Sequence, residues 1–304
     1  MEELRIVEWL LKGDVSMQYQ VKRDILGASI KEQNALQKRI SREGFGAKYL
    51  ANRSDWGGWG RSFYQPKWTC SHYTLLEMKN IGFPQNCPEA KAETARILKE
   101  EKGGNGSIMD DVCINGMVLN YASYFGAKEE ALKSLVDYIL EMRMADGGFN
   151  CRKSRSGAEH SSLHSTICVA EGIAEYMKQG YTYRIGGLVG AKETSQEFML
   201  QHRLYKSDHT GEIIDKKMLM LSNPPRWRYD ILRALDYFQA ARAGYDERMG
   251  DALEVLMGKR RNDGTWPSQM RQPGEVFFEM EQTGKPGRWN TLKALRVLKA
   301  YRKE

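Results

Sequence analysis

The stretch Asp146–Glu175, DGGFNCRKSRSGAEHSSLHSTICVAEGIAE, contains the pattern on which the fold prediction rests. It begins with a glycine-aromatic turn and continues through a loop that contains Arg152, Lys153 and Arg155. It ends in an apolar stretch whose hydrophobic residues recur with the period of a helix. A turn signal followed by a helical period predicts a turn, a loop and a helix as one structural unit.

The same unit recurs along the chain. Five glycine turns mark it: DWGGWG at Asp55–Gly60, GGNG at Gly103–Gly106, DGGF at Asp146–Phe149, HTGEI at His209–Ile213 and DGTW at Asp263–Trp266. Their anchor glycines, at positions 58, 104, 148, 211 and 264, are 46, 44, 63 and 53 residues apart. Such irregular spacing is typical of a helix-loop-helix unit with variable insertions. We expect the glycine-rich stretch Gly186–Gly190, within the longest interval, to be a loop.

Two kinds of helix alternate around these turns. Before the turns we expect charged, amphipathic helices at Pro88–Lys102, Glu129–Met144, Lys192–Tyr205 and Glu247–Arg261. After the turns we expect more apolar helices at Cys70–Asn80, Asp111–Tyr124, Ser161–Met177, Tyr229–Ala243 and Asn290–Tyr301. An outer layer that faces water and an inner layer that is buried predict an all-α protein, an α/α toroid around a central cavity. A solenoid of helix pairs would also fit the pattern.

The predicted toroid takes in the whole chain, residues 1–304, as one domain. Residues 3–40 have the pattern of further helices with a break at Gly13–Asp14, so we expect residues 1–45 to complete the ring.

The composition limits the partners and the compartment. The net charge of +7 is compatible with an anionic ligand, but basic and acidic residues alternate along the amphipathic helices, which is typical of a solvated surface. We therefore expect no nucleic-acid partner. No apolar run reaches the roughly 20 residues that span a bilayer, and the N-terminus lacks a signal-peptide pattern, so a cytoplasmic location is expected. The five cysteines form no CxxC pair, and no disulfide framework is expected.

The turns WGGWG, DGGF and DGTW resemble those of the terpenoid cyclases, squalene cyclases included, and of the β subunits of protein prenyltransferases. Asp111-Val112-Cys113 resembles the Asp-x-Cys pattern of the prenyltransferase zinc site. The stretch Leu163–Cys168 resembles the helix that carries the zinc-binding histidine. The resemblance implies a prenyltransferase-like or cyclase-like enzyme, a transferase or cyclase that holds a hydrophobic, isoprenoid-type ligand in its cavity.

The chain also departs from that family. No Lys or Arg occurs between Gly103 and Met109, where prenyltransferases hold a diphosphate, and only Met109-Asp110-Asp111 stands in place of the cyclase acid motif. A protein prenyltransferase would in addition need a partner subunit, which the sequence does not identify.

Four residues are candidates for catalysis: Asp110, Asp111, His160 and His164. Two adjacent carboxylates, when buried together, raise the pKa of one of them, which then serves as a general acid. The two histidines lie four residues apart, on one face of a helix if the helix begins early enough. The alternatives are helix capping for Asp111 and His160, and hydrogen bonding to a neighbouring helix for His164.

A zinc site is a further hypothesis. Asp111, Cys113 and His164 together offer a carboxylate, a thiolate and an imidazole, which suit a tetrahedral zinc with one open position. The alternative is an N-cap aspartate, a buried cysteine and a separate histidine.

Aromatic and polar residues near the starts of the inner helices are candidates for ligand binding: Trp68, His72, Tyr73, Arg226, Trp227, Tyr229, Asp230, Arg288, Trp289 and Asn290. Aromatic rings would suit an isoprenoid chain, a carbocation or the face of a sugar. Arg226 and Arg288 would bind an anionic group. Packing between successive units is the alternative role for the aromatic residues.

Two further functions stay open. One is a carbohydrate-active lyase or glycosidase on an α/α barrel, using histidine and tyrosine or a pair of carboxylates. The other is a non-catalytic binding or scaffold protein whose cavity is filled by side chains.

Overall fold

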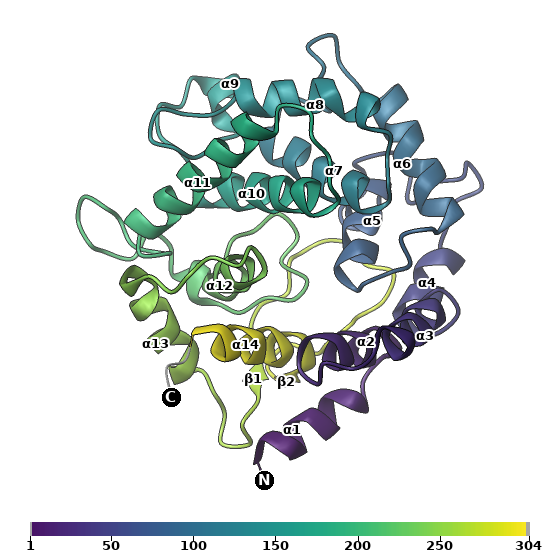
Figure 1. The fold of residues 1–304 in the computed structure, drawn as a ribbon, viewed down its shortest axis with the longest axis vertical. Helices are drawn as coiled ribbons and strands as arrows, with labels where there is room; N and C mark the ends of the chain where they lie inside the picture. The colour runs from purple at the N-terminus through teal and green to yellow at the C-terminus, as the bar shows by residue number, and fades with distance from the viewer. Residues whose placement is uncertain (1, 302–304) are drawn as a thin grey trace.

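The helices of the protein form two concentric rings (Figure 1). The structure is a computed structural model that describes residues 2–301. The inner ring consists of α2 (Val15–Asp24), α5 (Ser71–Asn80), α7 (Val112–Tyr124), α10 (Leu163–Lys178), α12 (Ile231–Ala240) and α14 (Arg288–Tyr301). The outer helices are α1 (Glu2–Leu11), α3 (Ile30–Ile40), α4 (Gly44–Ala51), α6 (Pro88–Glu100), α8 (Glu129–Glu141), α11 (Ile185–Gln201) and α13 (Gly250–Gly258). The predicted α/α toroid is confirmed.

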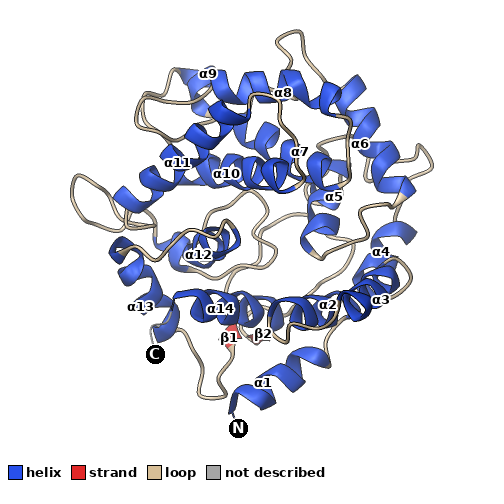
Figure 2. Cartoon of the chain, viewed as in Figure 1, coloured by secondary structure: helices blue, strands red, loops and turns tan. Residues whose placement is uncertain are grey.

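Little else is regular in the described part of the chain (Figure 2). The short helix α9 (Arg152–Ser156) lies in the basic loop, and two 3-10 helices span Lys216–Leu219 and Glu247–Met249. The strands β1 (Trp266–Pro267) and β2 (Pro286–Gly287) pair antiparallel. Among residues 2–301, no helix is long and apolar enough to cross a membrane.

The glycine-aromatic turn joins an outer helix to the next inner helix. In three units the backbone N–H of the turn aromatic donates to a hydroxyl in the first turns of the inner helix: Trp59 to Ser71 at 2.9 Å, Phe149 to Thr166 at 3.0 Å and Trp266 to Thr291 at 2.9 Å. The two indoles also donate to the carboxyl end of the preceding outer helix, Trp59 to Tyr49 and Trp266 to Leu256, both at 2.7 Å. The repeated motif is therefore explained by packing and hydrogen bonding.

The helix α11 differs from the prediction. It begins at Ile185, so the glycine-rich stretch Gly186–Gly190 is helical and the predicted loop is wrong. Glycine is a poor helix former, but Leu188 and Ala191 on the same turns are fully buried, and tertiary packing outweighs intrinsic propensity. A Cβ on Gly187 would lie only 3.2 Å from Leu140 of α8, so this glycine permits the two outer helices to pack closely.

The helices α7 and α10 touch through their backbones. A Cβ on Gly116 would lie 2.6 Å from the Cα of Val169, and a Cβ on Gly172 would lie 2.2 Å from the carbonyl oxygen of Gly116. Real Cβ contacts are not this short, so only glycine allows this approach. These two helices form the tightest side of the inner ring.

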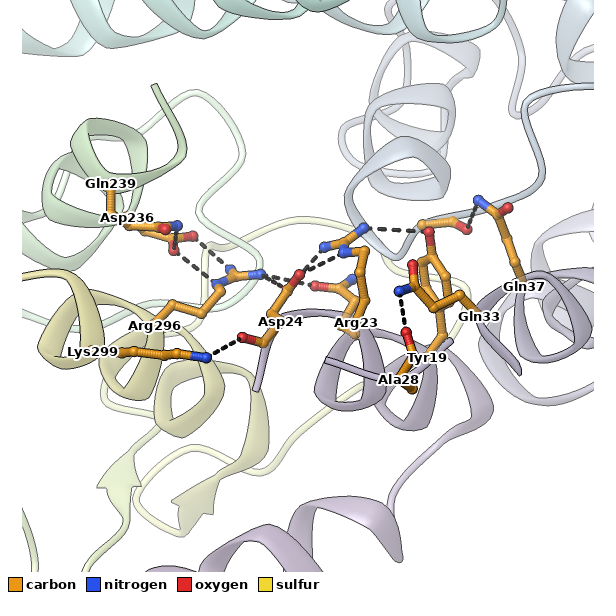
Figure 3. A network of polar contacts seen from close by, with 12 residues as sticks. Tyr19, Arg23, Asp24, Ala28, Gln33, Gln37, Asp236, Gln239, Arg296 and Lys299 are labelled. Carbon is orange, nitrogen blue, oxygen red and sulfur yellow. Dashed lines mark hydrogen bonds and ion pairs between the residues drawn. The ribbon is translucent and has the colours of Figure 1, made fainter. Parts of the chain in front are cut away.

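The first and last inner helices are joined by an ion network (Figure 3). Arg296 of α14 donates to Asp24 of α2 at 2.8 Å and to Asp236 of α12 at 2.7 Å. Arg23 donates to the same Asp24 at 2.9 Å. All three side chains of the Asp24–Arg296–Asp236 cluster are largely buried, so the network fastens the N-terminal helices to the C-terminal one.

Candidate active site

A cavity of about 960 Å³ lies within the inner ring. Its walls come mostly from the C-terminal halves of the inner helices α2, α5, α10 and α12 and from one face of α14. This volume is at the upper end of the roughly 300–1,000 Å³ that small-molecule sites occupy. The cavity is therefore large enough to hold a ligand, and it is not filled by side chains.

The walls of the cavity are strongly charged. Among the described residues, ten basic side chains line it: Arg23, Lys79, Lys178, Lys192, Arg226, Arg233, Arg242, Lys293, Arg296 and Lys299. The acidic side chains that line it are five: Asp24, Glu77, Glu171, Glu175 and Asp236. The excess of positive charge favours an anionic ligand.

Glu77 on α5 is a deeply buried carboxyl group in this wall. Glu77 is 2% exposed, and its Oε1 lies 3.4 Å from Nη1 of Arg226, which is 7% exposed. Burial raises the pKa of Glu77 above its usual range, and the positive charges of Arg226, Lys293 and Arg233 oppose this only in part. Glu77 is therefore suited to hold a proton that it can donate.

Glu171 on α10 is a second carboxyl group, in a different environment. Arg233 of α12 donates to its two oxygens at 2.8 and 2.7 Å. Although burial alone would raise the pKa of Glu171, the charge and hydrogen bonds of Arg233 lower it below its usual range. Arg233 is itself fixed by the carbonyl oxygens of Arg226 and Arg228, at 3.1 and 2.7 Å. Glu171 is therefore held as a carboxylate.

The two glutamates have environments that move their pKa values in opposite directions. This arrangement allows one group to act as an acid and the other as a base or nucleophile at the same pH. The aromatic residues Trp289, Tyr124 and Tyr237 are also among those that line the cavity.

A third carboxyl group, Glu281, lines a smaller pocket next to the large cavity. Its Oε1 accepts the backbone N–H of Trp289 at 2.9 Å, and burial raises its pKa to about 7. Its Oε2 is buried without a hydrogen-bond partner among the described residues. Glu281 faces a smaller pocket that shares Arg226 and Met280 with the large cavity.

Two of the ligand-binding residues expected from the sequence, Arg226 and Trp289, line the large cavity. Trp68 is not among the lining residues but packs against one of them: the guanidinium of Arg226 is 5.5 Å from its ring, and its indole donates to Pro273 at 2.9 Å. The backbone of Arg226 has a φ of +60°, a conformation that is uncommon for a residue with a side chain and that is often found at functional sites.

His72 and Tyr73 lie in an aromatic cluster on α5. The ring of His72 is fully buried against Phe63, Tyr64 and Tyr121, and burial lowers its pKa to about 3. The imidazole is therefore neutral. The hydroxyl of Tyr73 lies 3.1 Å from that of Tyr64. These contacts give both residues a packing role.

The remaining expected binding residues make hydrogen bonds and ring contacts within the protein. Tyr229 donates its hydroxyl to Leu204 at 2.6 Å, and Asp230 caps α12 by accepting the N–H of Arg233 at 2.9 Å. The guanidinium of Arg288 lies 4.5 Å from the ring of Trp9, on the outer helix α1. Asn290 donates to Leu221 and Pro267 at 3.3 and 2.9 Å. Trp227 lies 5.4 Å from the ring of His164.

The two histidines do not share a helix face. The helix α10 begins at Leu163, so His160 precedes it and is exposed, and the spacing of four residues does not bring His160 and His164 together. The Nδ1 of His164 accepts the N–H of Tyr229 at 2.8 Å, and burial lowers its pKa to about 4. The expected pairing of the two histidines is wrong, because a helix with both on one face would have to begin at His160, and α10 begins three residues later, at Leu163.

The carboxylates Asp110 and Asp111 are at the start of α7, at the other end of the inner helices from the large cavity. Asp110 is exposed, and its carbonyl oxygen accepts the hydroxyl of Tyr138 at 2.6 Å. Asp111 forms an ion pair with Arg155 at 3.0 Å, and partial burial raises its pKa despite the charge of Arg155.

A group with the geometry of a metal site contains Asp111 and Cys113. Together with Cys151 they place one carboxylate oxygen and two sulfurs within 4.8 Å of one another. The third member is thus Cys151 in place of the expected His164, whose Nδ1 is used by the backbone of Tyr229. Hydrogen bonding between the two thiols raises the pKa of Cys113 and lowers that of Cys151.

The main acid–base candidates were missed in the sequence. Glu77 and Glu171 both lie within apolar helical stretches, TLLEMKN and CVAEGIAE. Acidic residues are rarely buried without a partner, so a carboxylate in a buried helical stretch was a signal that could have identified them.

Comparisons with known proteins give a fold but no family. No protein-family model and no curated protein sequence matches the chain. A glycosyl hydrolase of family 88 from Bacteroides vulgatus has a similar structure, with a TM-score of 0.52 and 10% identity over 93% of this chain and 88% of that one. A polysaccharide lyase is similar with a TM-score of 0.53 and 12% identity, over 100% of both chains.

These structures correct the interpretation of the turns. Both of these similar structures are carbohydrate enzymes, a glycosyl hydrolase and a polysaccharide lyase, so the resemblance to terpenoid cyclases and prenyltransferases was wrong. The transferase or cyclase activity that it implied is wrong as well. The turn motif misled because its aromatic and glycine residues meet a packing requirement of the helical unit, as the hydrogen bonds of Trp59 and Trp266 show.

Proposed function

We propose that the protein is a carbohydrate-active enzyme, a glycosidase that hydrolyses an anionic saccharide in the central cavity. The observation that carries the proposal is the pair Glu77 and Glu171, two carboxyl groups in one cavity whose pKa values are moved apart. The structural likeness to a glycosyl hydrolase and a polysaccharide lyase supports the choice of substrate class.

Hydrolysis of a glycosidic bond needs the two states that these residues provide. Glu77 protonates the glycosidic oxygen as the bond to the anomeric carbon breaks. The carboxylate of Glu171 either activates a water molecule or attacks the anomeric carbon itself, and its negative charge stabilises the oxocarbenium-like transition state. Arg233 keeps Glu171 ionised through its two hydrogen bonds.

The substrate is proposed to be anionic because of the charge of the walls. Arg226 and Lys293 both lie close enough to Glu77 to oppose the rise of its pKa, so they are near the proposed acid. An acidic group on the sugar, such as a carboxylate or a sulfate, would bind there. Trp289 also lines the cavity, and an aromatic ring at this position would suit the face of a pyranose.

The excess of positive charge also favours a second candidate, a polysaccharide lyase. In that reaction a base removes the proton next to the carboxylate of a uronic acid, and the bond to the leaving oxygen breaks as a carbon–carbon double bond forms. The charge of the carboxylate must be neutralised to make that proton acidic, and arginine or lysine can do this. Glu171 as base, Glu77 as acid and Arg226 as the neutralising group would supply these roles.

One experiment tests the proposal and separates the two reactions. The purified protein is incubated with acidic and neutral oligosaccharides, and new reducing ends are measured together with the ultraviolet absorbance of unsaturated uronates. Reducing ends without this absorbance indicate a glycosidase, and reducing ends with it indicate a lyase. Failure to cleave any acidic saccharide would count against both.

Variants link the activity to the cavity. Glu77→Gln and Glu171→Gln should each lower kcat by about 10²–10⁴-fold, because each removes a proton-transferring group while keeping the shape of the side chain. Glu130→Gln is the matched control, since Glu130 is 80% exposed on the outer helix α8. Equal activity in all three variants would show that the cavity is not the active site.

A further inference from the structure

The start of helix α7 has an unusual arrangement of its capping groups. Asp111 occupies the N-cap position, yet its carboxylate makes no capping hydrogen bond to the helix. The N–H of Cys113, which an N-cap aspartate would ordinarily accept, donates instead to the sulfur of Cys151 at 3.3 Å. The carboxylate of Asp111 is therefore free of the role that its position normally gives it.

The three side chains converge from two separate segments. Asp111 and Cys113 belong to the start of α7, and Cys151 lies at the start of the short helix α9. One oxygen and two sulfurs lie within 4.8 Å of one another. Two sulfurs bound to one tetrahedral zinc ion are about 3.8 Å apart, because each Zn–S bond is about 2.3 Å. A shift of about 1 Å in the side chains would complete the geometry.

We propose that Asp111, Cys113 and Cys151 bind a zinc-type divalent cation. A carboxylate and two thiolates are ligands that zinc favours, and three protein ligands leave a fourth position for water or an anionic group. This site is distinct from the proposed glycosidase cavity, because its residues lie at the starts of the inner helices and the cavity lies toward their other ends.

The surroundings of the cluster fit a bound cation. The hydroxyl of Ser165 and the N–H of Cys113 both lie 3.3 Å from the sulfur of Cys151, as donors to metal-bound thiolates do. Arg155 lies 3.0 Å from Asp111 and competes for its carboxylate, but its side chain is 58% exposed and can turn into solvent. The guanidinium of Arg155 thus already places a positive charge beside the carboxylate that would bind a cation.

Cobalt titration tests the site without relying on activity. The full-length protein, reduced and freed of metal, is titrated with Co²⁺, and the thiolate-to-cobalt charge-transfer absorbance is recorded. We expect one Co²⁺ per chain with the intensity of two thiolate ligands, displaced by Zn²⁺. Cys113→Ser and Cys151→Ser should weaken binding by about 10-fold or more and halve the charge-transfer intensity or abolish it. Asp111→Asn should weaken binding and keep the intensity per bound ion.

Cys87→Ser is the matched control, because Cys87 and Cys151 are both 6% exposed and Cys87 lies at the start of another helix, α6. It should bind Co²⁺ as the parent protein does. Zn²⁺ should raise the unfolding temperature of the parent and of Cys87→Ser, and not that of Cys113→Ser. The proposal is overturned if the folded parent shows no charge-transfer band, if Cys87→Ser loses it equally, or if mass spectrometry finds Cys113 and Cys151 joined as a disulfide after anaerobic purification.

Discussion

Replacement of Arg296 by methionine tests whether the ion network closes the ring. Arg296 is 14% exposed and donates to Asp236 at 2.7 and 3.0 Å and to Asp24 at 2.8 Å. Methionine preserves much of the packing of the side chain but leaves the two aspartates, 18% and 15% exposed, without this partner. Removal of one member of a buried ion pair typically costs about 3–5 kcal/mol.

We expect a loss near the lower end of that range, about 3 kcal/mol, because Asp24 keeps its hydrogen bonds to Arg23. At about 2–4 °C per kcal/mol this lowers the unfolding temperature by roughly 6–12 °C. Chemical unfolding in urea, monitored by circular dichroism, and calorimetry measure the two quantities. The control is Arg39→Met, whose partner Glu43 is on the surface with 46% of its side chain exposed, and which should cost less than about 1 kcal/mol.

The stability difference between the parent and Arg296→Met should also depend on pH, and its direction of change follows from the pKa of Asp24. The pKa of Asp24 is lowered in the folded protein: burial would raise it, but hydrogen bonding to Arg23 and the charge of Arg296 outweigh this. The stability from this carboxylate is present above its unfolded pKa of 3.8 and is lost as the pH falls through the lower folded value. The difference between the parent and Arg296→Met should therefore shrink below pH 3.8. A cost no greater than that of Arg39→Met, or one that grows in acid, would refute the reasoning.

Three further substitutions test other parts of the structure. Burial raises the pKa of Glu77, so the parent should lose stability as the pH rises from 4.5 through the folded pKa. Glu77→Gln should remove this decline when stability is measured by urea unfolding at a series of pH values. Stability–pH curves of the two proteins that run parallel would contradict this expectation. Gly116→Ala should lower the free energy of unfolding by about 1–3 kcal/mol or more, since its Cβ would lie 2.6 Å from the backbone of α10. Gly190→Ala, with open space around its Cβ, should instead raise the free energy of unfolding by about 0.5–1 kcal/mol. Equal effects of the two variants in calorimetry would reject the close contact. Thr291→Val removes the acceptor of the buried N–H of Trp266 and should cost about 1–3 kcal/mol by tryptophan fluorescence in urea, and an unchanged midpoint would show that this bond adds no stability.

The sequence predicted the helices well because their signals are local. The apolar period and the turn glycines define where α5, α7, α10 and α12 begin and end to within a few residues. The start of α11 was missed because its glycines argue against a helix, and the packing of Leu188 and Ala191 that overrides them is not local.

The site was predicted less well because it depends on which residues meet across the ring. The histidine and cysteine pattern drew attention to the starts of the inner helices, whereas the large charged cavity lies toward their other ends. His164 was expected to join Asp111, but the backbone of Tyr229 lies beside it, and Cys151 meets Asp111 from a loop. Such contacts between distant segments follow from the path of the loops.

The loops also explain why the cavity lies where it does. The longest connections, residues 202–230 and 259–287, precede the inner helices α12 and α14. They meet across that end of the ring, where Gln269 donates to Leu221 at 2.8 Å and Trp68 donates to Glu275 at 2.7 Å. The connections that follow the inner helices are shorter. Side chains and loops therefore fill one end of the barrel and leave the other end hollow.

The position of the cavity determines which of its cations can bind a substrate. The C-terminal end of a helix carries partial negative charge, which a basic residue in the last turn offsets. Four of the cavity cations occupy such last turns: Arg23, Lys79, Lys178 and Lys299. Their charge is already balanced in part by the helices. Arg226 precedes α12 and Lys293 lies in the second turn of α14, so neither of them offsets the negative charge at the end of a helix. For the proposed glycosidase we therefore expect Arg226 and Lys293, which lie beside Glu77, to hold the anionic group of the substrate.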